Sequence, residues 1–419
     1  MEILNKQINN FICVFCKSIK LTEVINFGEV ALAGAFLKEK EFSNEKKYPL
    51  SLVFCNECYI VQVSDHVDPT VLFKTDFYFS SAIKTLQDHF SDYAKEVTDR
   101  FLIDKKNSIT LEFGSNDGVL LKPVKECGVG TVIGVDPATN IVESIENNDL
   151  VLINNFFTTS IAKDVVSNYG QVDIIMANNV FAHISDINGT TEAIDTALSD
   201  DGVFIFEVHY LGKIIEDMQY DFIYHEHIYY YSLLALKNHF ERHNMVIFDL
   251  KLINIHGGSM RYYVAKKTSK HAQYISKNVH DLKSKELSLG YDKPQAYINF
   301  SKKVQEKKIE LMDIIKKLTN EGKTIAGYGA SGRANTIIQY CGITKNDVGY
   351  IVDDGPAKQG LYTPGSHIPI KINEYLQENP PDYILIFAWA FYAEIIKKCE
   401  DFCNNGGKII VPLPKVKVL

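Results

Sequence analysis

The sequence contains no uninterrupted run of the roughly 18–20 apolar residues that a membrane-spanning helix needs. Its first residues also lack the basic start and apolar core of a secretory signal peptide, so we expect a cytoplasmic protein with no membrane partner. A basic excess is missing as well, because 52 acidic residues outnumber 44 Lys and Arg, giving a formal net charge of −8. This balance disfavours a general nucleic-acid-binding protein, which needs a basic surface.

Low-complexity tracts and short-period repeats are also absent, and the composition is that of a folded chain, with 46% hydrophobic and 23% charged residues. At about 100–200 residues per domain, a chain of 419 residues is expected to form two to four domains. Nothing in the composition requires a large assembly, and we expect a monomer or a weak dimer.

Four of the eight cysteines form two Cys-x-x-Cys pairs, Cys13 with Cys16 and Cys55 with Cys58. Two such pairs are the usual way to surround Zn²⁺ with four thiolates, whereas disulfides are disfavoured without a secretory signal. The 38 residues between the pairs, 17–54, exceed the common spacing and indicate an insertion. We predict a structural zinc ion, since four thiolates leave no open coordination position. Unligated thiols or a single redox pair remain alternatives.

Alternating buried strands and helices dominate the rest of the chain. An amphipathic helix is predicted at 82–101 and another at 294–320. Strands are predicted at 109–113, 131–136, 172–177 and 202–208, and then at 324–326, 348–352, 383–387 and 408–412. This alternation is typical of parallel, doubly wound α/β sheets. We therefore expect a small zinc module (1–75) and two Rossmann-like α/β domains (76–268 and 294–419), joined by a polar connector (269–293).

A glycine-containing turn, Glu112-Phe113-Gly114-Ser115-Asn116-Asp117-Gly118, follows the first predicted strand, where open α/β sheets bind ligands. Glu112 would repel a pyrophosphate but favour a cationic or zwitterionic ligand such as S-adenosylmethionine. Asp136, at the end of the next strand, can accept hydrogen bonds from both ribose hydroxyls. A purely structural turn is the alternative. The predicted cofactor-binding residues are Glu112, Gly114, Asn116, Gly118, Asp136, Asn155 and Asn178.

The least ordinary stretch is 220–232, in which His225 and His227 flank Glu226 among several tyrosines. Histidine titrates near neutral pH and suits proton abstraction, and a neighbouring carboxylate can orient its ring. His183 follows the strand that ends at Asn178 and Asn179, so we expect it on the same ligand-facing edge. A metal site formed by His225 and His227, or an aromatic core with satisfied histidines, remain alternatives.

A second glycine turn, Gly327-Tyr328-Gly329-Ala330-Ser331-Gly332, is a literal G-x-G-x-x-G after a strand, with Asp353 further on. Alone, this pattern is the dinucleotide-binding fingerprint. Glycine turns at helix N-termini also bind other phosphates, and Arg333 is placed to meet one. A nicotinamide cofactor, a nucleoside diphosphate sugar and a purely structural turn all remain open from these residues.

Together and in this order, the cysteine pairs, 112–118, Asn178-Asn179-Val180-Phe181-Ala182-His183, Tyr224-His225-Glu226-His227 and 327–333 match a known family. Over essentially its full length, the chain resembles the S-adenosylmethionine-dependent C-methyltransferases of nucleotide-linked (dTDP-type) 4-keto deoxysugars. The resemblance implies an N-terminal zinc module, a central cofactor domain and a C-terminal domain that binds the nucleotide-sugar substrate. It also implies methylation at C3, beside the C4 ketone.

The resemblance further implies a general base, His227, supported by Glu226, with Tyr224, His183 and Tyr78 around the sugar ring. The expected substrate-binding residues are Asn179, His225, Gly329, Ser331 and Arg333. The chemistry agrees, because removing a proton next to a ketone gives an enolate that can attack a sulfonium methyl group held in line. An NAD(P)-dependent keto-sugar oxidoreductase, or an enzyme that both methylates and reduces, is the alternative.

Overall fold

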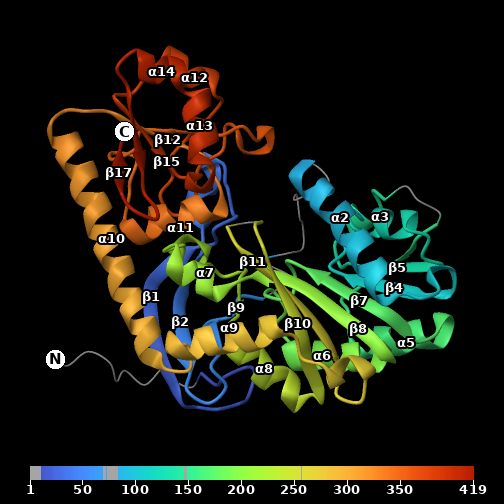
Figure 1. The fold of residues 1–419 in the computed structure, drawn as a ribbon. Helices are drawn as coiled ribbons and strands as arrows, with labels where there is room; N and C mark the ends of the chain where they lie inside the picture. Colours follow the sequence, from blue (N-terminus) through green and yellow to red (C-terminus); the bar gives the residue numbers. More distant parts are fainter. Residues whose placement is uncertain (1–10, 69–71, 73–83, 146–148, 256) are drawn as a thin grey trace.

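Three β-sheets organise the computed structural model, which describes residues 11–68, 72, 84–145, 149–255 and 257–419 (Figure 1). The N-terminal sheet has the order β1-β2-β3-β9 and is antiparallel throughout. Its strands are β1 (Leu21–Ala31), β2 (Lys47–Cys55), β3 (Val61–Val63) and β9 (Tyr229–Tyr230). Because β9 directly follows the His-Glu-His segment, the N-terminal sheet fixes one end of that segment.

The central sheet has seven strands in the order β10-β11-β8-β7-β4-β5-β6. They are β4 (Ile109–Phe113), β5 (Thr131–Val135), β6 (Val151–Ile153), β7 (Val172–Asn178), β8 (Leu198–His209), β10 (Met245–Ile253) and β11 (Ser259–Lys266). Strands β4 to β8 are parallel, as predicted. The β10–β11 hairpin, which we did not predict, adds β11 antiparallel to β8.

The C-terminal sheet has six strands in the order β14-β13-β12-β15-β16-β17, and β17 alone runs antiparallel to its neighbour. They are β12 (Ile325–Tyr328), β13 (Ile351–Val352), β14 (Ile370–Lys371), β15 (Tyr383–Ile386), β16 (Lys408–Val411) and β17 (Lys417–Val418). The α/β prediction for this region is confirmed, although β13 is shorter than the strand predicted at 348–352.

Helices cover the sheets and make the crossovers between parallel strands. The α-helices are α2 (Lys84–Phe101), α3 (Leu121–Glu126), α4 (Thr139–Val142), α5 (Thr159–Tyr169), α6 (Ile187–Ala197), α7 (Leu211–Glu216), α8 (Leu233–Arg242), α9 (Lys277–Ser288), α10 (Pro294–Asn320), α11 (Gly332–Cys341), α12 (Glu374–Glu378), α13 (Tyr392–Lys398) and α14 (Glu400–Asn404). The short 3₁₀ helices are η1 (Glu39–Asn44), η3 (Lys105–Asn107), η4 (Tyr220–Phe222), η5 (Lys270–Gln273), η6 (Pro356–Lys358) and η7 (Trp389–Phe391). In the described part of the chain, no helix has the length and apolarity to cross a bilayer.

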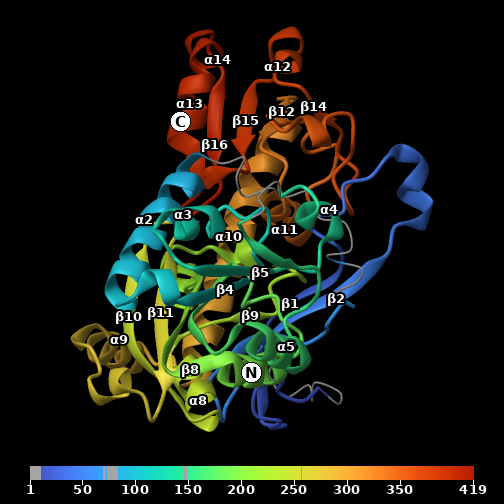
Figure 2. The same cartoon turned by 90° about the vertical axis from the view of Figure 1, so that its right-hand side faces the viewer.

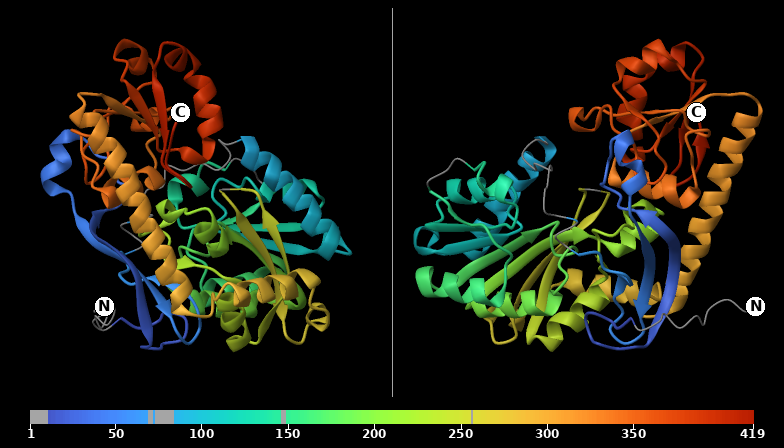
Figure 3. Two further views of the ribbon diagram at one scale, coloured as in Figure 1. Left: turned by 60° about the vertical axis from the view of Figure 1, so that its left-hand side comes forward. Right: turned by 180° about the vertical axis from the view of Figure 1, so that it is seen from behind.

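Helix α10, predicted at the same bounds, connects the N-terminal sheet with the C-terminal domain (Figure 3). Its buried face repeats at helical spacing and includes Tyr297, Val304, Leu311 and Ile315. These side chains belong to one hydrophobic cluster that also contains residues of β1, β2 and the C-terminal sheet. The N-terminal module and the C-terminal domain therefore share a continuous core.

The tip of the β1–β2 hairpin provides a second link between these two parts (Figure 2). Phe42 stacks on His367 with ring centroids 3.8 Å apart, and Glu45 Oε2 lies 2.8 Å from His367 Nε2. The N-terminal module and the C-terminal domain are thus joined at two places.

The stretch that we expected to be a polar connector, 269–293, instead contains η5 and α9. The side chain of Glu286 is buried, and its carboxylate accepts hydrogen bonds from the amides of Leu233 and Leu234 and from the Tyr210 hydroxyl. Because only Val279 and Glu286 of α9 are buried, the helix has no apolar stripe that the sequence could reveal. The domain boundaries themselves stay predictions.

Candidate active site and zinc site

The four cysteines of the two Cys-x-x-Cys pairs converge, with all four sulfurs within 4.8 Å of one another. Sulfurs of different pairs lie opposite each other, since Cys13 Sγ is 3.5 Å from Cys58 Sγ and Cys16 Sγ is 3.5 Å from Cys55 Sγ. Tetrahedral Zn–S bonds of about 2.3 Å place sulfurs about 3.8 Å apart. The cluster therefore fits one structural zinc ion, and its sulfurs are too far apart for disulfides.

Both cysteine turns have the same backbone geometry. The amide of Lys17 donates to the Cys13 carbonyl, and the amide of Tyr59 donates to the Cys55 carbonyl, each at 2.9 Å. Lys17 and Tyr59 both have positive φ, 61° and 67°. This repetition shows that each turn is shaped to present two thiolates to a shared ion, although 38 residues separate the pairs.

The predicted cofactor residues gather where β4, β5 and β7 end. Asn178 Nδ2 donates to Glu112 Oε1 at 3.0 Å, which links the ends of β7 and β4. Glu112 Oε2, Asn178 Oδ1 and Ser115 Oγ are buried and have no hydrogen-bond partner among the described residues. Buried polar atoms normally have partners, so this group of acceptors fits a ligand that carries N–H donors and positive charge. The ammonium and sulfonium of S-adenosylmethionine meet that requirement.

Asp136 holds the first glycine turn together. Its Oδ2 accepts from the amide of Asn116 and its Oδ1 from that of Ala138, both at 2.9 Å, and its contact with ribose hydroxyls stays a prediction. Gly114 has φ +65°, and an added Cβ would lie 2.6 Å from Val180 Cγ2, so only glycine fits.

Two further predicted cofactor residues lie at the periphery of this group. Gly118 has φ +76° and faces Ile145, which would lie 3.7 Å from an added Cβ. Asn155 is exposed, two residues after β6, and its Oδ1 accepts from the amide of Phe156. Their contact with the cofactor stays a prediction.

Burial, together with the nearby carboxylates Asp136, Asp117 and Glu207, raises the pKa of Glu112 to about 8, while the hydrogen bond from Asn178 opposes the shift. Binding a cation should therefore require loss of this proton. Between pH 6 and 8 we expect the affinity for S-adenosylhomocysteine, measured by calorimetry, to rise about tenfold per pH unit and then level off. An affinity that does not change over this range would contradict the assignment.

The matched variant is Glu112→Gln, which keeps the acceptor for Asn178 but cannot ionise. Because the pKa in the folded state lies above the ordinary 4.5, the stabilisation from the protonated carboxyl is complete below pH 4.5 and is lost as the pH rises to about 8. Thermal melts should show that ligand-free Glu112→Gln gains stability over the wild type as the pH rises from 5 to 8. Its affinity for S-adenosylhomocysteine should be weaker at pH 8 and independent of pH.

His227 lies in a turn between η4 and β9, and its two ring nitrogens have different partners. Nδ1 is 2.9 Å from the Phe222 carbonyl oxygen, and Nε2 is 3.1 Å from the Tyr224 hydroxyl. A carbonyl can only accept, so the neutral ring carries its proton on Nδ1 and its lone pair on Nε2. This tautomer presents Nε2 as the basic atom.

His183 is brought next to His227, with ring centroids 5.0 Å apart. It belongs to the loop that leaves β7 at Asn178 and passes Gly114 through Val180. The amide of His183 donates to the Val180 carbonyl, and its Nδ1 donates to the Glu226 carbonyl at 2.5 Å. This single loop therefore connects the sheet edge that carries the predicted cofactor residues to the predicted base.

Two further members of the predicted catalytic and sugar-binding set, Asn179 and Glu226, belong to the same two segments as this pair. Asn179 is exposed at the start of the same loop and has φ +55°. Glu226 directs Oε1 toward Gly34 of the N-terminal module, and a Cβ added to Gly34 would lie 3.4 Å from this oxygen. The contact that orients the His227 ring comes from the Phe222 carbonyl and not from Glu226. Tyr78 lies outside the described residues. The roles of all these residues stay predictions.

His225 is buried, and its Nε2 donates to the Pro49 carbonyl at 3.1 Å. Burial lowers the pKa of His225, which favours the neutral ring. This placement matches the alternative of a core histidine in part, because Nε2 has a hydrogen-bond partner while the buried Nδ1 has none among the described residues. A metal site shared by His225 and His227 is not supported, because the segment forms a turn rather than a strand and the two rings meet different partners.

The second glycine turn is packed against protein atoms. An added Cβ on Gly329 would lie 2.6 Å from Ala388 Cβ, and one on Gly327 would lie 2.8 Å from Ile351. Ser331 caps α11 by accepting from the amide of Ala334. Asp353, which would contact the ribose in a dinucleotide site, already accepts from the amide of Ala330 and pairs with Lys358. These contacts explain the glycines without a nicotinamide cofactor.

Arg333 reaches from α11 to Asp221, where Nε donates to Oδ2 at 2.8 Å. Its Nη2 is buried without a partner among the described residues and can serve an anionic ligand. Sequence reasoning missed Asp221, Phe222 and Trp389, which meet Arg333 here. The one available signal was Trp389, the only tryptophan of the chain.

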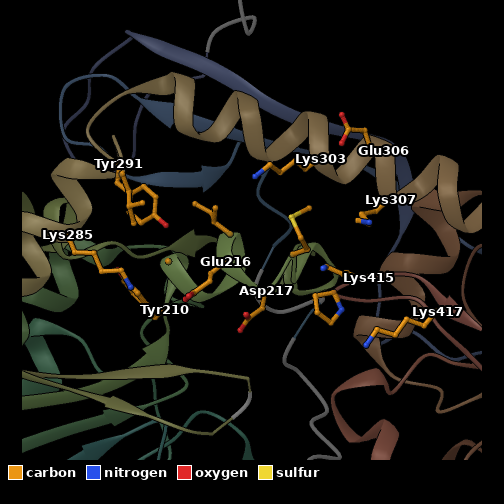
Figure 4. Close-up of a pocket in the computed structure, with 15 residues that line it drawn as sticks. Tyr210, Glu216, Asp217, Lys285, Tyr291, Lys303, Glu306, Lys307, Lys415 and Lys417 are labelled. Carbon is orange, nitrogen blue, oxygen red and sulfur yellow. The ribbon is translucent and has the colours of Figure 1, made fainter. Parts of the chain in front are cut away.

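A cavity of about 820 Å³ lies between α7, α9, α10 and the C-terminal residues (Figure 4). Lys303, Lys307, Lys415 and Lys417 surround one part of it, and Glu216 and Asp217 line another. No predicted site residue lines this cavity, so it lies outside the candidate active site.

Comparison with known proteins agrees with this arrangement. Residues 13–73 match the family model "Putative zinc binding domain", residues 86–249 match "Methyltransferase domain" and residues 254–414 match "C-methyltransferase C-terminal domain". The C-methyltransferase NovU of Streptomyces niveus is 30% identical over 408 residues, which cover 97% of this chain and 96% of NovU.

Solved structures resemble only part of the chain. A methyltransferase of Clostridium acetobutylicum aligns with 43% of this chain and 92% of its own at 15% identity, with a TM-score of 0.33. Magnesium protoporphyrin IX methyltransferase of Synechocystis aligns with 42% of this chain and 82% of its own at 12% identity and a TM-score of 0.32. Scores of this size carry no conclusion about function.

The family assignment thus depends on the near-complete match to NovU, and the three matched segments correspond to the cysteine cluster, the edge around Glu112 and the C-terminal α/β region. The chain belongs to the family of S-adenosylmethionine-dependent C-methyltransferases that carry an N-terminal zinc-binding module.

Proposed function

We propose that this enzyme methylates C3 of a nucleotide-linked 4-keto deoxysugar. The observation that carries the proposal is the pair of hydrogen bonds of His227, which in a neutral ring place the proton on Nδ1 and the lone pair on Nε2, next to the loop that runs from β7 to His183. Methylation of carbon requires a carbanion equivalent, and the hydrogen next to a ketone is the accessible source. A neutral imidazole suits that proton near pH 7.

The contacts of Tyr224 indicate how the negative charge of the enolate can be stabilised. When Nε2 of His227 takes the proton from C3, it no longer accepts from the Tyr224 hydroxyl. That hydroxyl can then donate to the developing enolate oxygen, so the stabilising hydrogen bond becomes available as the negative charge forms. S-adenosylmethionine supplies the electrophilic methyl group. The new C–C bond forms as the C–S bond breaks, and the proton stays on His227 until solvent removes it.

We assign His183 to the sugar rather than to proton removal because the family resemblance makes His227 the base. The Nδ1 of His183 donates to the Glu226 carbonyl, which holds its ring beside that of His227. We further propose that the C-terminal domain binds the nucleotide, with Nη2 of Arg333 as a donor to a phosphate oxygen. Gly329 and Ser331 shape the turn from which Arg333 projects.

The test is a transfer assay with methyl-¹³C-labelled S-adenosylmethionine and a panel of dTDP-, GDP-, UDP- and CDP-linked 4-keto sugars. We expect NMR to locate the label on C3 of one of these sugars. Label on an oxygen, or no transfer to any of them, would refute the proposal. Reduction of the ketone by NAD(P)H, with a thermal shift caused by that cofactor alone, would support the oxidoreductase instead.

A further inference from the structure

An ion pair between the partly exposed Arg333 and the buried Asp221 joins the C-terminal domain to η4, which precedes the candidate base. Asp221, in η4, is completely buried, and its Oδ2 accepts from Arg333 Nε and from Trp389 Nε1, each at 2.8 Å. A desolvated carboxylate is costly unless charged or polar partners compensate it. This contact therefore holds η4 against two separate elements of the C-terminal domain, α11 and η7.

Phe222, the residue after Asp221, has a neighbouring side chain on each face of its ring. The guanidinium carbon of Arg333 lies 3.9 Å from the ring centroid of Phe222, and the His209 ring stacks on Phe222 at 3.8 Å with an interplanar angle of 10°. Attraction between a cation and an aromatic face is strongest where water is excluded. Arg333 thus holds Phe222 both directly and through Asp221.

The position of Phe222 matters because its carbonyl accepts from His227 Nδ1 at 2.9 Å. That carbonyl determines which ring nitrogen carries the proton and which carries the lone pair. We infer that Arg333 is a positioning residue, which sets the tautomer of His227 through Asp221 and Phe222. The base is then competent only while the C-terminal domain is docked on η4. The catalytic part of this inference rests on the proposed function, but the tautomer does not.

The test uses full-length protein labelled with ¹⁵N-histidine, with the His227 signals assigned by their loss in a His227→Gln variant. In the wild type we expect one tautomer, protonated on Nδ1. In Arg333→Lys, which keeps the charge but loses the planar fork, and in Arg333→Gln, we expect signals of both tautomers. We also expect kcat for methyl transfer to fall at least tenfold, while KM for S-adenosylmethionine changes less than twofold.

The control is Lys316→Gln, which breaks an ion pair with the buried Asp347 elsewhere in the same domain. It should leave the His227 signals unchanged. If both Arg333 variants keep wild-type His227 signals, or if Lys316→Gln mixes the tautomers equally, the inference is wrong. If an Arg333 variant fails to fold, which its melting curve shows, Trp389→Phe replaces it, because this change removes one donor to Asp221 but keeps a ring. Trp389→Phe should mix the tautomers of His227 to a smaller extent. Unchanged His227 signals in this variant would overturn the inference. Absence of methyl transfer in the wild type would refute only the proposed function.

Discussion

Replacing His227 with Gln is expected to lower kcat for methyl transfer by roughly 10²–10⁴-fold, the range that a positioned general base contributes. Gln can still donate toward the Phe222 carbonyl, but its amide has no basic lone pair at the position of Nε2. Binding of S-adenosylhomocysteine should stay within a fewfold of the wild type, because the cofactor residues at the ends of β4, β5 and β7 are untouched.

The measurement combines steady-state kinetics with calorimetric titration of S-adenosylhomocysteine. His243→Gln is the matched control, since His243, which directly follows α8, interacts with Asn188 of α6. Activity of His227→Gln within a fewfold of the wild type would remove His227 from the mechanism. A parallel loss of cofactor affinity would indicate damage to the fold rather than loss of the base.

Removal of zinc is expected to have the second large effect. Structural zinc contributes on the order of 10 kcal/mol to the folding of small domains. Here Cys13, Cys55 and Cys58 also belong to a hydrophobic cluster with residues of the central sheet, which includes Leu111 and Phe113. We therefore expect Cys55→Ser to lose the metal, to melt well below the wild type and to lose methyl transfer, because β3 pairs with β9 directly after His227.

Elemental analysis of protein purified without chelator should give close to one zinc per chain. Cys127→Ser is the control, because Cys127 is partly exposed in the central domain and lies outside the sulfur cluster. Native protein without zinc, or a Cys55→Ser variant with the melting temperature and activity of the wild type, would contradict the metal assignment.

Much of the fold follows from local patterns in the sequence. The helix at 294–320 has apolar residues at helical spacing and a proline at its first position, so its bounds could be predicted. The β10–β11 hairpin and α9 could not, because both depend on packing against the central sheet. In α9 this packing buries the polar Glu286 instead of an apolar stripe.

In the candidate site, too, some residues could be predicted from local patterns and others could not. Glu112, Asp136 and Asn178 were identifiable because each lies at the carboxyl end of a buried strand, and the ends of parallel strands meet at one edge. The link from Arg333 to Asp221 spans 112 residues and the link from Trp389 to Asp221 spans 168, so no local pattern reveals them. The orientation of His227 by the Phe222 carbonyl was equally hidden, since a main-chain acceptor leaves no mark on the sequence.

Deuterium exchange tests the central claim most directly. The enzyme is incubated in D₂O with the keto sugar identified by the transfer assay and with S-adenosylhomocysteine, so that deprotonation can occur without methylation. We predict that NMR shows deuterium entering at C3 with the wild type and no exchange above background with His227→Gln. Equal exchange in both proteins, or none in a wild type that transfers methyl groups, would show that His227 does not remove this proton.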